Sequence, residues 1–306
     1  MRLVFAGTPD AAVPSLRVLT ASAHDVAAVV TRTDAPLGRK RVLTPSSVAQ
    51  AATDLGLSVV KTDRLDDAAT AEIARLAPDL GVIVAYGGLV REPLLSTPRH
   101  GWINLHFSLL PAWRGAAPVQ RALVAGDSVI GAGVFQLVAA LDAGDVFDEI
   151  RYRVPPLATA DRVLADLAEQ GAELLHRVVD QIAAGTARAV PQSGEPTYAP
   201  KLTAEDGRLD WTRPADEILA RWRGTTPEPG AFTTLEGARV KVIELHRADA
   251  ESALAPGRLA LDGSAIRVGT GTDPLLLARV QPAGKSAMAA GDWYRGIRSA
   301  EPVVGS

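Results

Sequence analysis

Hydrophobic and polar positions in the first part of the chain alternate between two periods. Short aliphatic and β-branched runs are typical of buried strands, and stretches with apolar residues every three or four positions are typical of amphipathic helices. The runs predict strands at Leu3–Ala6, Val26–Thr31, Val59–Lys61, Leu80–Ala85, Trp102–Leu105, Gly133–Val138 and Phe147–Val154. The stretches predict helices at Ala11–Ser22, Thr44–Leu55, Asp66–Leu76, Pro118–Ala125 and Ala160–Ala184. Strands that alternate with helices indicate an α/β fold with a Rossmann-like, doubly wound, mostly parallel sheet, which binds ligands near the carboxyl ends of its strands.

The pattern changes after a stretch rich in proline and glycine at Ala189–Lys201. Beyond it, short strands follow one another closely, with one helix near Ala215–Trp222. The strands are predicted at Arg239–Leu245, Gly257–Leu261, Ala265–Gly269 and Leu275–Val280. Such spacing favours a small β-barrel or sandwich. We therefore expect a first domain over residues 1–189, a linker over 190–202 and a second domain over 203–306.

Composition excludes several classes of function. The 306 residues contain no cysteine, which rules out disulfides, thiolate zinc sites, iron–sulfur clusters and cysteine nucleophiles. No apolar run approaches the ~18 residues of a membrane span. The N-terminal residues enter a short strand directly and lack the layout of a signal peptide, so we expect a cytoplasmic protein.

Net charge is −3, from 32 basic and 35 acidic residues, and this sum by itself counts against a nucleic-acid partner. A sum over the whole chain hides local patches, however. The polar stretch Thr33–Val42 contains three consecutive basic residues, Arg39, Lys40 and Arg41, directly after Gly38.

Three polar residues at predicted strand ends could carry chemistry. Asn104 and His106 flank Leu105 and therefore point to the same side of an extended segment. Asp142 lies in a predicted loop, Leu141–Asp145, after another strand, and we expect the carboxyl ends of neighbouring parallel strands to bring it close to the other two. An amide donor, an imidazole and a carboxylate suit acyl transfer, since they can stabilise a carbonyl oxygen, move a proton and orient the imidazole. Taken singly, each also fits a structural histidine, a turn aspartate or a loop-capping asparagine.

Metal and nucleotide chemistry are less well supported. None of the five histidines (His24, His100, His106, His176 and His246) pairs with another at the spacing of common zinc sites, so we expect no metal. The first turn, Gly7–Asp10, lacks both G-x-G-x-x-G and the Lys-Ser/Thr of a P-loop. A nicotinamide dehydrogenase or an ATPase is therefore not expected.

The segment Asn104-Leu-His-Phe-Ser-Leu-Leu-Pro111, with Arg114-Gly115 and the downstream Leu141-Asp-Ala-Gly-Asp145, resembles the signature of the folate-dependent formyltransferases. The resemblance extends from Phe5–Asp10 to Gln281–Lys285 and so covers nearly the whole chain. It implies transfer of a formyl group from 10-formyltetrahydrofolate to the α-amine of methionine on initiator tRNA. It also implies that the second domain is a small OB-like β-barrel.

The resemblance further assigns roles to individual residues. The implied catalytic residues are Asn104, His106 and Asp142, and the implied folate-binding residues are Ser108, Leu109, Leu110 and Pro111. The implied tRNA-binding loop contains Arg39, Lys40 and Arg41. Phe107 departs from the family, which usually has glycine there, and this substitution bears on the wall of the folate pocket.

Two other functions remain open on the sequence. A formyltransferase that acts on a sugar-nucleotide amine or on glycinamide ribonucleotide would share the three polar residues without needing the basic loop. The second alternative is a non-catalytic folate- or RNA-binding module on the same scaffold, and the intact polar set argues against it. We expect the chain to act as a monomer with no membrane partner.

Overall fold

The computed structural model describes the chain except for residues 39, 250–253, 300 and 306. It divides into two compact units. The first comprises Met1–Pro118, Ile130–Tyr152 and Leu164–Ala199, and the second comprises Val119–Val129, Arg153–Val163 and Pro200–Ser306. Within the described residues, no helix is both long and apolar enough to cross a membrane.

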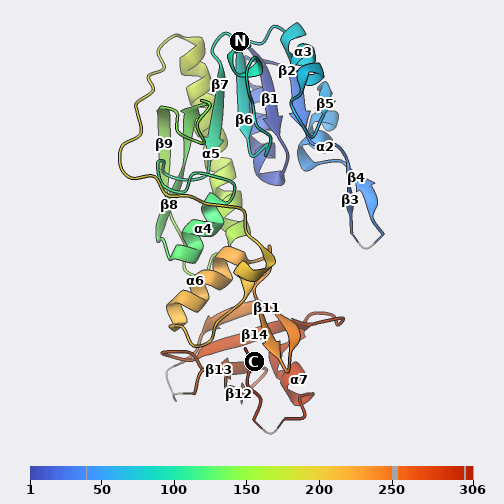
Figure 1. Cartoon of the computed structure of the whole chain (residues 1–306), viewed down its shortest axis with the longest axis vertical. Coiled ribbons are helices and arrows are strands. Elements are labelled where there is room, and N and C mark those ends of the chain that lie inside the picture. The colour runs from blue at the N-terminus through green and yellow to red at the C-terminus, as the bar shows by residue number, and fades with distance from the viewer. Residues whose placement is uncertain (39, 250–253, 300, 306) are drawn as a thin grey trace. The chain divides into compact units, whose positions relative to one another are not determined.

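A seven-stranded sheet forms the centre of the first unit, in the order β5-β2-β1-β6-β7-β8-β9 (Figure 1). Its strands are β1 (Arg2–Gly7), β2 (Asp25–Thr31), β5 (Val59–Lys61), β6 (Leu80–Val84), β7 (Trp102–His106), β8 (Val129–Gln136) and β9 (Val146–Arg153). The strands from β5 to β7 are parallel, and β8 runs antiparallel to β7. This is the strand order of a doubly wound sheet, so the predicted fold class is confirmed.

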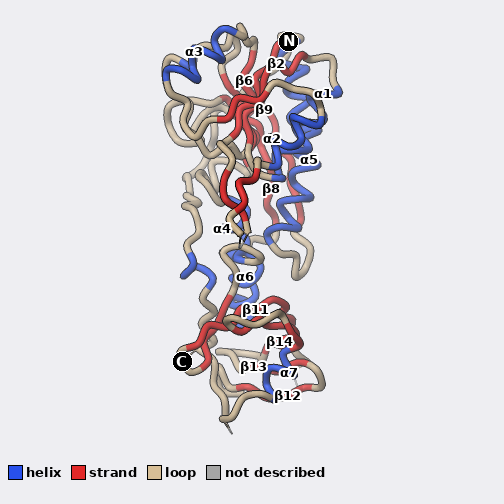
Figure 2. Tube along the Cα trace, turned by 90° about the vertical axis from the view of Figure 1, so that its right-hand side faces the viewer, coloured by secondary structure: helices blue, strands red, loops and turns tan. Residues whose placement is uncertain are grey.

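Helices cover both faces of this sheet: α1 (Val13–Ala21), α2 (Ser47–Asp54), α3 (Asp67–Arg75) and α5 (Ala160–Ala183). Figure 2 shows α1 and α5 on one face and α3 on the other. Trp102 of β7 and Ile73 of α3 share a core cluster, while Leu105 of β7 lies against Gly171 of α5. Because side chains alternate along a strand, Asn104 and His106 share the face of Trp102, opposite to α5.

One predicted loop contains strands. In the stretch Thr33–Val42, strand β3 (Ala35–Leu37) pairs antiparallel with β4 (Val42–Thr44), and this hairpin extends away from the seven-stranded sheet (Figure 1). The prediction missed both strands because they are short and do not alternate between buried and exposed positions. Leu37, Val42 and Leu43 are each more than half exposed.

Strand β8 begins at Val129, four residues before the predicted start, in a segment interrupted by glycines. Gly131 is required by close packing. A Cβ there would lie 2.1 Å from the carbonyl oxygen of Ile150 in β9 and 2.5 Å from Leu109. Glycine in a strand often marks such an approach of another backbone, and here it lets β9 and Leu109 pack against β8.

The second unit contains a six-stranded antiparallel sheet in the order β10-β11-β14-β13-β12, with β15 on β14. Its strands are β10 (Phe232–Leu235), β11 (Ala238–Arg247), β12 (Leu259–Asp262), β13 (Ala265–Val268), β14 (Leu275–Pro282) and β15 (Met288–Ala289). Its helices are α4 (Pro118–Ala125), α6 (Ala215–Thr225) and α7 (Ala290–Arg295). The predicted C-terminal β architecture is confirmed, whereas β10, β15 and α7 were missed. Trp211 and Trp222 are buried in its core.

Candidate active site

Strand β7 places two of the predicted site residues on one face of the sheet. Asn104 lies opposite Ile83 of β6 and Phe135 of β8, and His106 is the last residue of the strand. The prediction that the two side chains share a side is therefore confirmed by the strand geometry. His106 is 6% exposed, and Asn104 is half-buried.

Asp142 reaches His106 by a route that differs from the expected one. We expected the carboxyl ends of neighbouring parallel strands to bring the two together, but β8 is antiparallel to β7. The connection between β8 and β9 instead carries the carboxylate to the site, where Asp142 Oδ2 lies 4.0 Å from His106 Nδ1. The two side chains are 12% and 7% exposed, so little solvent screens their interaction.

The hydrogen bonds of His106 determine its tautomer. Its Nε2 lies 2.9 Å from the carbonyl oxygen of Trp113. A carbonyl oxygen only accepts, so Nε2 carries the proton, and in the neutral ring Nδ1 keeps a free lone pair on the side of Asp142. The ring also meets Phe135 edge-on, with centroids 6.3 Å apart.

Burial lowers the pKa of His106 below the usual value for histidine, against the opposing effects of the Asp142 charge and the Trp113 hydrogen bond. The imidazole is therefore neutral at pH 7. A neutral ring with an available Nδ1 can accept a proton, and the nearby carboxylate stabilises the imidazolium that results.

Backbone contacts hold the Asp142 carboxylate in place. Oδ2 accepts a hydrogen bond from the backbone N–H of Gly115 at 2.8 Å. Asp142 itself adopts a left-handed backbone with φ of 44°, a conformation that costs ~1–3 kcal/mol and persists only where the surroundings enforce it. Gly144 follows in the same turn, where a Cβ would lie 1.7 Å from the Gln136 carbonyl oxygen.

Asn104 presents an unpaired polar group. Its Oδ1 is buried and has no hydrogen-bond partner among the described residues. Leaving such an atom unpaired costs ~1–3 kcal/mol. The amide offers both an acceptor and two donors, so a substrate that carries N–H and C=O groups could pair with it.

The segment predicted to bind folate forms a tight turn directly after β7. Ser108 is buried, and its hydroxyl donates to the Ala112 carbonyl oxygen at 2.6 Å. Leu109, Leu110 and Pro111 are half-buried. Phe107 is 6% exposed, which places its side chain in the interior.

The predicted tRNA-binding loop forms the tip of the β3–β4 hairpin. Lys40 and Arg41 are exposed there, and Arg41 has a φ of 50°. Arg39, the third predicted residue, lies outside the described residues. The basic residues of the hairpin tip therefore belong to a different element from β7, the strand that contains Asn104 and His106.

Sequence reasoning missed the residues that support the site. Gln192 and Thr197 lie in the stretch expected to be a linker, yet both make hydrogen bonds to the loops around His106 and Asp142. No periodicity or motif marks them. The sequence pointed only to their neighbours Arg114 and Gly115, which belong to the signature quoted above. Arg114 donates to Gln192, and Gly115 donates to Asp142.

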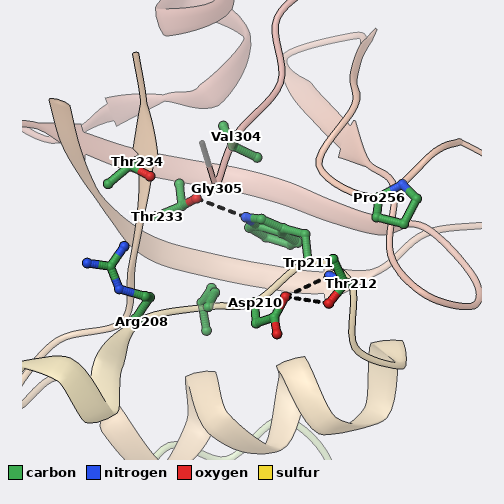
Figure 3. A pocket seen from close by; sticks show the side chains of 10 residues that line it. Arg208, Asp210, Trp211, Thr212, Thr233, Thr234, Pro256, Val304 and Gly305 are labelled. Carbon is green, nitrogen blue, oxygen red and sulfur yellow. Dashed lines mark hydrogen bonds between the residues drawn. The ribbon is translucent and has the colours of Figure 1, made fainter. Parts of the chain in front are cut away.

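The second unit has a cavity of about 240 Å³ beside Trp211 (Figure 3). Its indole N–H donates to the Thr233 hydroxyl at 2.9 Å, and the Asp210 carboxylate accepts from Thr212. Asn104, His106 and Asp142 do not line this cavity and belong to the first unit. Across the described ranges, no group of three or more His, Asp or Glu residues could hold a metal ion.

The fold and this polar set are compatible with acyl transfer, and the comparisons identify the class of protein. The chain belongs to the formyl transferase family: residues 1–179 match the model of formyl transferase and residues 201–298 match the model of the formyl transferase C-terminal domain. It is 60% identical to a methionyl-tRNA formyltransferase of Clavibacter sepedonicus, over 99% of this chain and 100% of that protein.

Two solved structures show the same fold at low identity. The N-formyltransferase of Helicobacter canadensis, in complex with folinic acid and dTDP-3-aminofucose, superposes with a TM-score of 0.69 at 14% identity, over 92% of this chain and 98% of that one. HypX of Aquifex aeolicus superposes with a TM-score of 0.68 at 18% identity, over 98% of this chain. The chain spans about half the length of HypX, at 48%.

Proposed function

We propose that this chain transfers the formyl group of 10-formyltetrahydrofolate to the α-amine of methionine on initiator methionyl-tRNA, for translation initiation. The observation that carries the proposal is the neutral, buried His106 with its Nδ1 facing Asp142, on the same strand as Asn104, whose Oδ1 is buried and unpaired. The 60% identity to a methionyl-tRNA formyltransferase over both whole lengths supports the choice of acceptor.

His106 moves the proton in this mechanism. The α-amine has a pKa near 8, so a useful fraction of it is neutral and nucleophilic at pH 7. As the amine nitrogen bonds to the formyl carbon, Nδ1 of His106 takes its proton, because Nε2 is already occupied by the bond to Trp113. Asp142 stabilises the imidazolium across the 4.0 Å gap. The same Nδ1–H then returns the proton to the folate nitrogen as the carbon–nitrogen bond to folate breaks.

Asn104 acts on the oxygen. Attack on the formyl carbon places negative charge on its oxygen, and an amide N–H of Asn104 donates to it. Loss of one such donor raises the barrier by ~3 kcal/mol. The transfer needs no covalent enzyme intermediate, since the amine attacks the formyl carbon directly.

The remaining expectations complete the proposal. Residues 1–189 act as the catalytic domain, with Ser108–Pro111 lining the folate site. Residues 190–202 lead to a second domain, 203–306, which supports tRNA binding. Lys40 and Arg41 at the exposed hairpin tip contact phosphates of the acceptor arm, together with Arg39. The proposed setting is the cytoplasm, with one chain sufficient because all proposed catalytic residues come from the same unit.

A formylation assay with two acceptors tests the proposal. Purified protein receives 10-formyltetrahydrofolate with charged initiator tRNA in one arm and an amino-sugar nucleotide in the other. Formylation of the methionyl-tRNA is the expected result. Preferential formylation of the sugar amine would overturn the acceptor and favour the sugar formyltransferase alternative.

Two variants test the site itself. Asn104→Ala and Asp142→Ala should each lower kcat at least ~100-fold while the far-ultraviolet circular dichroism stays unchanged. Normal turnover in either variant would remove the mechanism given above.

A further inference from the structure

The stretch Val190–Ala199, which we call the strap, lies along the two loops that form the candidate site. We infer that Gln192 of the strap is a positioning residue for Asp142, and that the strap is part of the active-site scaffold. The inference rests on the proposed function, because it concerns how that function's carboxylate is held.

Gln192 uses both ends of its side-chain amide. Nε2 donates to two carbonyl oxygens of the catalytic turn, those of Asp142 and Gly144, each at 2.8 Å. Oε1 accepts from the guanidinium of Arg114, from Nη2 at 2.6 Å and from Nε at 3.2 Å. The two donors and the oxygen of the amide are therefore all paired.

Arg114 determines which way this amide faces. A guanidinium only donates, so the amide oxygen must point toward Arg114 and the NH₂ group toward the turn. The neighbouring residue Gly115 supplies the N–H that holds the Asp142 carboxylate at 2.8 Å. Gln192 thus holds the backbone of Asp142. The loop of Arg114 and Gly115, to which Gln192 is hydrogen-bonded, holds the Asp142 carboxylate.

The rest of the strap holds the partner of His106. Thr197 Oγ1 accepts from the backbone N–H of Trp113 at 2.9 Å, and the Arg114 backbone pairs with Thr197 and Ala199 at 2.8 and 2.7 Å. Trp113 has a φ of 62°, a left-handed conformation that needs such support. Its carbonyl oxygen is the acceptor that determines the His106 tautomer.

A positional role follows from the geometry of the turn. Asp142 also has a left-handed backbone, so the turn relaxes when its external hydrogen bonds are removed. A shift of ~1 Å in a reacting group can cost ~100-fold in rate. The contact between Asp142 and His106 already spans 4.0 Å, so any outward movement weakens it.

Two substitutions remove these bonds in different ways. Gln192→Leu deletes both donors and the acceptor at similar volume. Gln192→Glu keeps the shape and the attraction for Arg114, but it places a carboxylate oxygen against the carbonyl oxygens of Asp142 and Gly144. Each should lower kcat ~10- to 100-fold, with KM for 10-formyltetrahydrofolate changed less than ~2-fold. Gln181→Leu, on the exposed surface of α5, is the matched control and should behave as wild type.

A double-variant cycle separates positioning from a general loss of stability. If Gln192 acts through Asp142, Gln192→Leu should lower kcat no more than ~2-fold further in the Asp142→Asn background. Independent effects that multiply, or Gln192 variants with wild-type kcat, would overturn the inference. A failure of the proposed function would give a different result, because Asp142→Asn alone would then retain full activity.

Discussion

Replacement of Asp142 by asparagine removes a charge while keeping the shape of the side chain. The amide oxygen can still accept from Gly115 N–H, so the turn keeps its main contact. What disappears is the attraction between the carboxylate and the imidazolium that forms during transfer. At the observed 4.0 Å this attraction amounts to ~4 kcal/mol at an effective dielectric constant of 20, and ~1 kcal/mol in bulk water.

Both side chains are largely buried, so the value near 4 kcal/mol applies more closely. Since ~1.4 kcal/mol corresponds to a tenfold change in rate, we expect kcat to fall by ~100- to 1,000-fold. KM for 10-formyltetrahydrofolate should change little, because Asp142 contacts the proton carrier and its loop.

The pH profile of the same variant gives a second measurement. In the wild type, the rate falls in acid as His106 takes up a proton, at a pKa that burial holds below the usual histidine value. The Asp142 charge raises this pKa, so its removal lowers the pKa further. The acid limb of kcat should therefore move to lower pH in Asp142→Asn.

Single-turnover formylation of methionyl-tRNA between pH 5 and 8.5 measures both effects. Asp148→Asn, on the exposed part of β9, is the control and should match the wild type. An acid limb that stays in place or moves to higher pH would refute the assignment of His106 as the group that titrates under the influence of Asp142.

Three further predictions concern stability and tRNA use. Because the folded-state pKa of His106 lies below its unfolded value of about 6.5, the unfolded state takes up this proton first as pH falls below 6.5, and the folded state follows only near its own lowered pKa. Urea unfolding should thus show stability lost with falling pH, and the loss should be smaller in His106→Gln. The double variant Lys40→Ala, Arg41→Ala should raise KM for tRNA several-fold and leave KM for folate unchanged. The slope of log KM for tRNA against log salt should flatten by ~1 per lost phosphate contact. Equal loss for both substrates would contradict the assignment of the hairpin tip to tRNA binding. Thr233→Val leaves the buried indole N–H of Trp211 unpaired and should lower the free energy of unfolding by ~1–3 kcal/mol, as measured by urea denaturation.

Local periodicity was sufficient for most of the first unit. The buried runs at Leu3–Ala6 and Leu80–Ala85 became β1 and β6, because a continuous apolar run is buried on both faces of a parallel sheet. The predicted helix start at Thr44–Ser46 lies at the Ser46 N-cap of α2, whose hydroxyl accepts from Ala49 N–H at 3.0 Å. The prediction failed for short elements that bury no face, as in the β3–β4 hairpin.

Within the candidate site, the alternation of side chains along a strand already placed Asn104 and His106 together, since a period of two is a property of the extended backbone itself. The position of Asp142 beside His106 came from the tertiary structure, because the connection after the antiparallel strand β8 returns to the site. Gln192 likewise contacts a turn fifty positions away in the chain, through hydrogen bonds that leave no periodic pattern. Strand and helix patterns come from contacts near in sequence, whereas the carboxylate and its supports depend on contacts that only the folded chain makes.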